Sequence, residues 1–89
     1  ILYVEGVRDY IKINMEDGTS IQTLMSLKAA EEMLPDTNFV RVHRSFIVNI
    51  DKVKTIERNN IIFGKQYIPI SDSYRDDFNK LFSSRTINW

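Results

Sequence analysis

Apolar and polar residues alternate near the start of the chain, and this pattern predicts β-strands. Ile11, Ile13 and Met15 fall on one side and polar residues on the other, which is the period of two expected of a half-buried strand. The neighbouring segments are predicted as follows: a strand at residues 1–4, a polar turn at residues 5–9, a hairpin turn at Asp17-Gly18, and a return strand with weaker alternation at residues 19–24.

The segment of residues 39–50 has two apolar runs on either side of His43, Arg44 and Ser45. The runs contain β-branched and aromatic residues, which are typical of strands, so the three polar residues are predicted to form an exposed turn between them. A histidine and an arginine fixed side by side can donate directional hydrogen bonds to an anion or to a base edge. The alternative interpretation is a histidine at a strand end and a solvated arginine.

The remaining β segments follow the same logic. The predicted elements are strands at residues 53–58, 61–63 and 66–70, with a tight connection at Asp51-Lys52 and turns at Asn59-Asn60 and Gly64-Lys65. Pro69 cannot donate a hydrogen bond to a sheet, so the last strand is expected at an edge or to end there.

Two helices are predicted from apolar residues at helical spacing. Ser26 is a good N-cap for the first helix, which stops at Pro35; its apolar positions are Leu27, Ala30, Met33 and Leu34. Ser71 is expected to cap the second, with a capping box from Ser73 to Asp76 as a further option; its apolar positions are Tyr74, Phe78, Leu81 and Phe82. Residues 83–89 show no clear pattern, and Trp89 is interpreted either as a packing residue or as part of a frayed end.

These patterns predict a mainly β fold with antiparallel strands and two short helices. At 89 residues the chain is expected to form one domain, residues 1–89, with residues 83–89 as a tail. It lacks cysteine, an apolar run long enough to span a membrane and a basic-then-apolar leader, so we expect a cytoplasmic protein. Its first residues already resemble a strand, which suggests a piece of a longer polypeptide.

The formal net charge is zero, but the charge is unevenly distributed. Residues 39–65 carry six basic and two acidic side chains, a net charge of +4, whereas the two helical segments, residues 26–37 and 71–82, carry −2 and −1. A basic β surface could follow DNA phosphates or bind an acidic protein. Single-stranded RNA binding would need exposed aromatic residues, but Tyr10, Tyr67 and Tyr74 are better explained by packing.

Enzyme functions find little support. The chain has one histidine, no cysteine and no glycine-rich phosphate loop. Glu31 and Glu32 are adjacent on the first helix, point in different directions and have no accompanying base or nucleophile. We therefore expect no catalytic activity, no metal site and no cofactor.

The residues 39–50 resemble the signature of the LytTR family of DNA-binding domains. Further similar pieces occur in the order expected for the family, from about Leu2 to Phe82: Tyr3-Val4-Glu5-Gly6, Asp9-Tyr10-Ile11, Asp17-Gly18, Ser26-Leu27 with Leu34, Val53 with Ile56, and Ile68-Pro69-Ile70-Ser71. The chain departs from the family pattern in two places. It lacks a strand ahead of Leu2, and it has Asp72-Ser73 where many relatives carry basic residues.

The resemblance implies a bacterial response regulator whose DNA-binding domain follows a receiver domain. Loops would enter successive grooves of double-stranded DNA with some bending, on direct repeats, and homodimer formation is left open. Arg8, Asp9 and Tyr10 would reach one major groove; His43, Arg44 and Ser45 the minor groove or its phosphates; and Ser71, Ser73 and Arg75 the next major groove. Further DNA contacts are expected from these basic residues: Lys12, Arg41, Lys52, Lys54 and Lys65.

Overall fold

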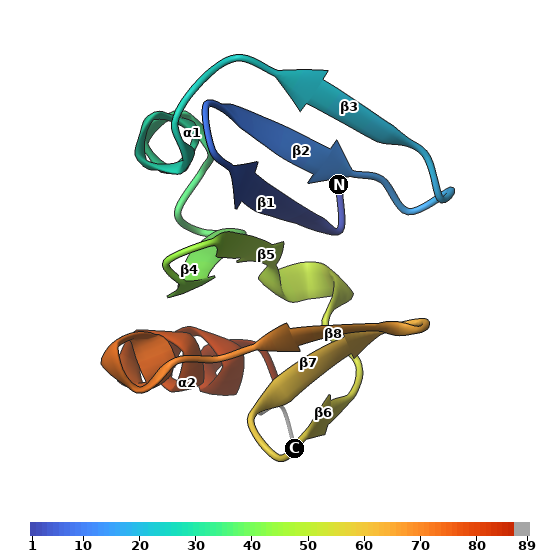
Figure 1. Ribbon diagram of the computed structural model, residues 1–89. Coiled ribbons are helices and arrows are strands. Elements are labelled where there is room, and N and C mark those ends of the chain that lie inside the picture. The colour runs from blue at the N-terminus through green and yellow to red at the C-terminus, as the bar shows by residue number, and fades with distance from the viewer. Residues whose placement is uncertain (87–89) are drawn as a thin grey trace.

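The computed structural model describes residues 1–86 and is elongated, with extents of 41 × 24 × 22 Å. It consists mainly of antiparallel strands with two α-helices, which confirms the predicted fold class (Figure 1). The strands are β1 (Tyr3–Val7), β2 (Tyr10–Asn14), β3 (Ser20–Thr23), β4 (Phe39–His43), β5 (Phe46–Asn49), β6 (Ile56–Glu57), β7 (Asn60–Phe63) and β8 (Gln66–Pro69). The helices are α1 (Leu27–Met33), the 3-10 helix η1 (Ile50–Lys52) and α2 (Asp72–Thr86).

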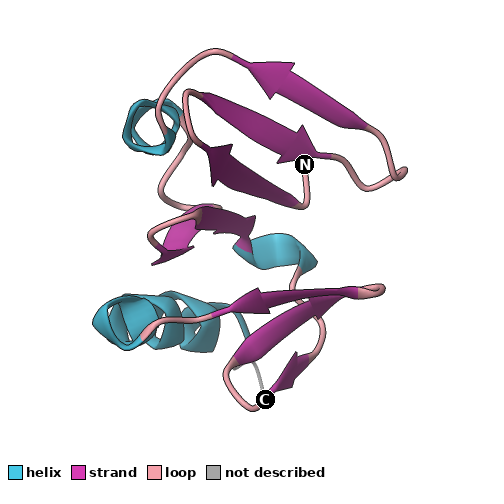
Figure 2. Cartoon of the chain, in the orientation of Figure 1, coloured by secondary structure: helices cyan, strands magenta, loops and turns pink. Residues whose placement is uncertain are grey.

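A five-stranded sheet of order β3-β2-β1-β5-β4, called the central sheet below, has β3 at the outer edge of the molecule and β5 and β4 near its middle (Figure 1). Helix α1 lies against it at one end, while α2 and the three-stranded sheet β6-β7-β8 lie on its other side (Figure 2). Alternation along β1 separates two cores. Tyr3 packs in the core that holds Val48 and Phe78, whereas Val4 packs with Ile47 and with Leu27 of α1. Successive side chains of β1 point to opposite faces of the central sheet, and each face is covered by a core of its own.

Several local signals predicted their elements correctly. Gly18, in the turn after β2, has a φ of 93°. The Ser26 hydroxyl oxygen accepts a hydrogen bond from the Ala29 N–H at 3.0 Å and so caps α1. Pro69 lies on β8, an edge strand of the smaller sheet. Phe78 is 1% exposed and its ring stacks on that of Phe82, as the apolar spacing along α2 predicted.

The start of the chain and the segment after β5 differ from the prediction. The predicted turn at residues 5–9 is too long: Glu5, Gly6 and Val7 continue β1 because they pair with β2, and the turn itself is Arg8-Asp9. The predicted strand at residues 53–58 is also too long. Helix η1 forms the predicted tight connection at Asp51-Lys52, and only β6 (Ile56–Glu57) is strand, pairing with two residues of β7.

The turn after β6 lies one residue earlier than predicted. Arg58 and Asn59 have φ values of 50° and 66°, while Asn60 already pairs with Glu57. A two-residue hairpin with two positive φ angles matches the right-handed twist of its strands, and this requirement overrides the preference for asparagine at both positions.

The helices also differ from the prediction in detail. Met33 is 73% exposed because α1 ends at that residue and only Leu27 and Ala30 of the helix are buried. Ser73 cannot begin a capping box, since α2 starts at Asp72 and Ser73 already lies in the first turn. The helix continues through Thr86, so residues 83–86 are not tail. Trp89 lies outside the described residues.

Candidate nucleic-acid interface

Three turns that the sequence predicted as DNA-reading segments lie along one side of the molecule. They are the β1–β2 turn at Arg8-Asp9, the β4–β5 turn at Arg44-Ser45, and the start of α2 after Ser71. In Figure 1 all three are on the left, one below another. The fold therefore brings together segments that are far apart in the sequence.

Backbone hydrogen bonds connect the two outer segments to the central hairpin. The Gly6 N–H, at the end of β1, donates to the Ser45 carbonyl at 2.8 Å. The Ser71 N–H, before α2, donates to the Val42 carbonyl at 2.8 Å, and the Ser71 hydroxyl lies 3.4 Å from the same oxygen. The β4–β5 pairing shifts register between Arg41 and His43, so Val42 lies at a bulge. A bulge bends a strand and changes the direction of its backbone groups, and the carbonyl at this bulge is the one that accepts from Ser71.

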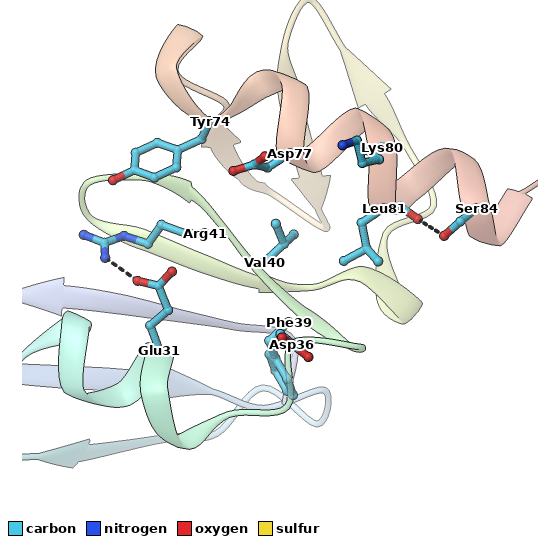
Figure 3. A pocket seen from close by; sticks show the side chains of 10 residues that line it. All are labelled: Glu31, Asp36, Phe39, Val40, Arg41, Tyr74, Asp77, Lys80, Leu81 and Ser84. Carbon is cyan, nitrogen blue, oxygen red and sulfur yellow. Dashed lines mark hydrogen bonds and ion pairs between the residues drawn. The ribbon is translucent and has the colours of Figure 1, made fainter.

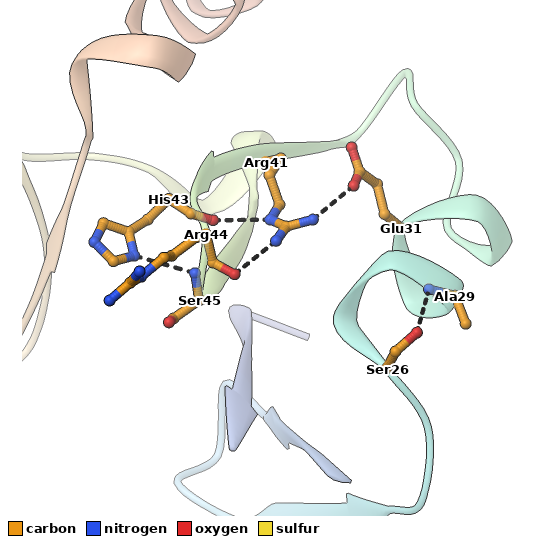
Figure 4. A network of polar contacts seen from close by, with 7 residues as sticks. All are labelled: Ser26, Ala29, Glu31, Arg41, His43, Arg44 and Ser45. Atoms are coloured by element: carbon orange, nitrogen blue, oxygen red, sulfur yellow. Dashed lines mark hydrogen bonds and ion pairs between the residues drawn. The ribbon is translucent and has the colours of Figure 1, made fainter. Parts of the chain in front are cut away.

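The β4–β5 turn presents His43 and Arg44 side by side (Figure 4). The His43 Nδ1 accepts a hydrogen bond from the Ser45 N–H at 3.1 Å, and the imidazole lies 5.6 Å from the Phe46 ring. Because Nδ1 accepts this hydrogen bond, Nε2 is the ring nitrogen of His43 that can donate to a partner. Arg44 is exposed, whereas Ser45 is only half-buried.

Arg41 belongs to an internal network rather than to this exposed surface. Its side chain is 15% exposed and forms an ion pair of 2.9 Å with Glu31 on α1. Its Nε donates to the His43 carbonyl at 2.8 Å and its Nη2 to the Arg44 carbonyl at 2.6 Å. The guanidinium carbon also lies 5.7 Å from the centre of the Tyr74 ring on α2. We call Glu31, Arg41, Tyr74 and these two carbonyls the Arg41 network.

The β1–β2 turn carries an exposed Arg8 with a φ of 55°. This left-handed conformation costs a residue with a Cβ about 1–2 kcal/mol relative to the right-handed region. Asp9 is exposed and Tyr10 is half-buried at the start of β2. The turn therefore projects one cation and one carboxylate toward the solvent.

At the start of α2, Arg75 forms an ion pair with Asp72, three residues earlier. The Arg75 Nε is buried and has no hydrogen-bond partner within residues 1–86. Ser73 is exposed beside the pair. Asp72 thus orients the nearby arginine.

The fold does not bring all predicted basic residues to this side. Lys12 is half-buried within β2, where it pairs with Glu5 and Gln22. Lys52, at the end of η1, forms an ion pair of 3.1 Å with Glu16. Helix η1 is the short helical turn after β5 in Figure 1, on the side opposite the three turns. Lys52, Lys54 and Gly64 line a separate groove there.

A groove of about 610 Å³ lies between α1, β4 and α2 (Figure 3). Its lining includes Glu31, Arg41, Tyr74, Asp77 and Lys80. The groove combines carboxylates and cations without a histidine or a nucleophilic pair. Among residues 1–86 there is no cluster of metal-ligating side chains, and no helix there is long and apolar enough to cross a membrane.

Comparison with known families decides the relationship. A family model described as the LytTr DNA-binding domain matches residues 1–83. The chain belongs to this family. A solved LytTr DNA-binding domain from Bacillus cereus has 31% sequence identity and a TM-score of 0.76, with coverage of 91% of this chain and 79% of that chain. The match confirms the LytTr fold that the sequence motifs indicated.

Curated relatives of this LytTr domain are longer proteins. The sensory transduction protein LytT of Bacillus subtilis (strain 168) is 32% identical over 94 residues, which cover 90% of this chain and 39% of that protein. The protein of the same name from Bacillus cereus is 29% identical over 90 residues, covering 85% of this chain and 37% of that protein. The chain thus spans about two fifths of the length of these relatives.

Proposed function

We propose that this LytTr domain binds double-stranded DNA sequence-specifically as part of a bacterial transcriptional regulator, without catalytic activity of its own. The observation that supports this proposal is the row of three turns along one side of a molecule 41 Å long. One turn of B-DNA measures about 34–36 Å, so such a side can follow a major groove, the intervening minor groove and the next major groove.

Each turn has a role in this proposal. Arg8 and Arg75 read guanines in the two major grooves, because arginine can donate two parallel hydrogen bonds to a guanine edge. Arg44 enters the minor groove or contacts its phosphates, and His43 and Ser45 add donors beside it. Asp9, Tyr10, Ser71 and Ser73 shape the outer contacts, whereas Lys12, half-buried within β2, lies outside this interface. Lys52 and Lys54, on the opposite side, stay outside this interface.

The whole regulator is part of the same proposal. We infer that a receiver domain accompanies this domain in the full-length cytoplasmic protein, since the LytT relatives are more than twice as long as the matched region. Binding to direct repeats would then place two copies on one operator, and a homodimer of the full-length protein would join them.

Selection from random duplex DNA, followed by fluorescence anisotropy at several salt concentrations, tests the proposal. We expect a defined motif, and Arg44→Ala should weaken binding to it by about tenfold or more, since one specific base contact contributes about 1–3 kcal/mol. The thermal midpoint should hardly change, because Arg44 is exposed. Lys54→Ala removes one exposed cation from the opposite side and should have little effect on this binding.

Other outcomes would overturn the proposal in different ways. Steep salt dependence without an enriched motif would mean phosphate contact alone. A lack of binding at low salt would favour a protein-interaction module that uses its basic face on an acidic partner.

A further inference from the structure

We infer that Glu31 and Arg41 are positioning residues that hold the β4–β5 turn in its DNA-reading shape, and that Arg41 itself does not contact DNA. This inference rests on the proposed function. It assigns a DNA-binding role to a carboxylate, Glu31, whose charge alone would oppose DNA.

The geometry of Arg41 supports this role. Its Nε and Nη2 donate to the carbonyls of two consecutive residues, His43 and Arg44, at 2.8 and 2.6 Å. The guanidinium is a rigid planar fork, so two such bonds fix the orientation of both peptide groups relative to β4. These two peptide groups lie on either side of the Arg44 Cα. The direction of the Arg44 side chain therefore depends on Arg41.

Glu31 sets the position of the guanidinium in turn. The carboxylate bonds the remaining nitrogen, Nη1, at 2.9 Å, so each of the three nitrogens of Arg41 has a partner within the protein. Only 15% of the Arg41 side chain is exposed, which leaves little of it for a phosphate. Figures 3 and 4 show the guanidinium between Glu31 of α1 and the turn, with Tyr74 of α2 on another side.

The network also links the start of α2 to the central turn. Tyr74 lies in the first turn of α2, between Ser73 and Arg75, and its ring is 5.7 Å from the Arg41 guanidinium carbon. Ser71 is bonded to Val42, the residue next to Arg41. A displaced Arg41 would therefore shift the β4–β5 turn relative to the start of α2.

Simple electrostatics and the positioning role predict opposite changes in DNA affinity when Glu31 is removed. Removal of a carboxylate near DNA reduces repulsion of phosphates and should leave binding unchanged or strengthen it. If Glu31 positions the turn, its removal should weaken binding to the selected motif. Glu32 provides a matched control, because it is the adjacent residue on α1, is exposed, and removes the same charge when replaced.

The experiment measures Glu31→Ala, Glu32→Ala and Arg41→Lys against the selected duplex. Alanine favours the helix at both glutamate positions, so helix propensity is not a difference between the two. We expect Glu31→Ala to weaken specific binding about fivefold or more, since hydrogen bonds to charged groups are among the stronger ones. Glu32→Ala should change it less than about twofold. Arg41→Lys keeps the charge but loses the fork, and should resemble Glu31→Ala.

A double-mutant cycle separates positioning from general damage. In an Arg44→Ala background, the added effect of Glu31→Ala on DNA binding should largely disappear, because the side chain it positions is absent. Amide resonances of Arg44 and Ser45 in the free domain should move in Glu31→Ala and not in Glu32→Ala. Arg44→Ala retains the backbone carbonyl, so it should leave the network itself intact.

The results distinguish the two proposals. If the unaltered domain binds a defined motif but Glu31→Ala behaves like Glu32→Ala, the positioning role is wrong while the proposed function stands. The positioning role is also wrong if the effects of Glu31→Ala and Arg44→Ala simply add. If the unaltered domain binds no duplex, the proposed function fails and the positioning role fails with it.

Discussion

Two arginines of this domain lie in opposite surroundings. Arg41 has its three guanidinium nitrogens bonded within the protein, whereas Arg8 is exposed at the tip of a hairpin. Arg8 also has a φ of 55°, a conformation in which glycine would be less strained. Backbone strain of this kind often occurs at functional positions, where a residue serves binding although glycine would fit the backbone better.

Arg8→Gly should therefore separate stability from function. We expect the free energy of unfolding to rise by about 0.5–1 kcal/mol, as the strained backbone is relieved, while DNA affinity falls. Urea denaturation and anisotropy measure the two effects. Arg44→Gly is the matched comparison: Arg44 is not among the positive-φ residues, so its replacement should lower the free energy of unfolding. Destabilisation by both changes would contradict the argument.

At the scale of elements, the strands of the central sheet differ in how much they contribute to the core. Val48 on β5 is fully buried and packs in the core that contains Phe78 of α2. Strand β3 is an edge strand, and near it Ile21 and Leu24 are 53% and 82% exposed. Apolar residue type alone does not distinguish these positions. Val48 is buried because other elements pack against it, whereas Ile21 and Leu24 are exposed.

Val48→Ala and Leu24→Ala compare a buried strand position with an exposed position just after the edge strand β3. Truncation of the buried valine should lower the free energy of unfolding by about 1–3 kcal/mol, because it removes buried methyl groups and leaves a cavity. Truncation of the exposed leucine should change it by less than about 0.5 kcal/mol. Thermal and urea unfolding provide the values. A large effect of Leu24→Ala would mean that the segment after β3 is covered in solution.

At the scale of the whole molecule, net charge gives little information about the partner. The domain is neutral overall, so its long-range field is weak, and DNA recognition must depend on local geometry. The elongated shape supplies that geometry, because it separates the β1–β2 turn from the start of α2 with the β4–β5 turn between them.

This order predicts the layout of a hydroxyl-radical footprint on the selected duplex. Protection should extend over about one helical turn, roughly 10 base pairs. Arg8→Ala should remove protection at one end, Arg75→Ala at the other, and Arg44→Ala in the middle. Lys54→Ala should leave the whole pattern in place. Uniform weakening by all three arginine changes would argue against separate contacts along the groove.

Much of this fold could be predicted from local patterns. The N-cap at Ser26, the glycine turn at Gly18 and the two apolar runs around Arg44 each depend on residues within a few positions of one another. Backbone conformation, capping and face alternation act over that range, so their signals are visible in the chain itself. The central motif was also sufficient to indicate the LytTr family, which the family model then confirmed.

What the sequence by itself determined is thus the type of each main element, the polar turn between β4 and β5 with its exposed Arg44, and the family. Tertiary structure alone decided that Glu31, ten residues earlier in the chain, bonds Arg41, that Met33 lies in solvent, and that η1 places Lys52 opposite the three turns. Each of these features depends on contacts between elements that are far apart in the sequence. Such contacts follow from the packing of two cores on the central sheet, and a short stretch of sequence cannot reveal them.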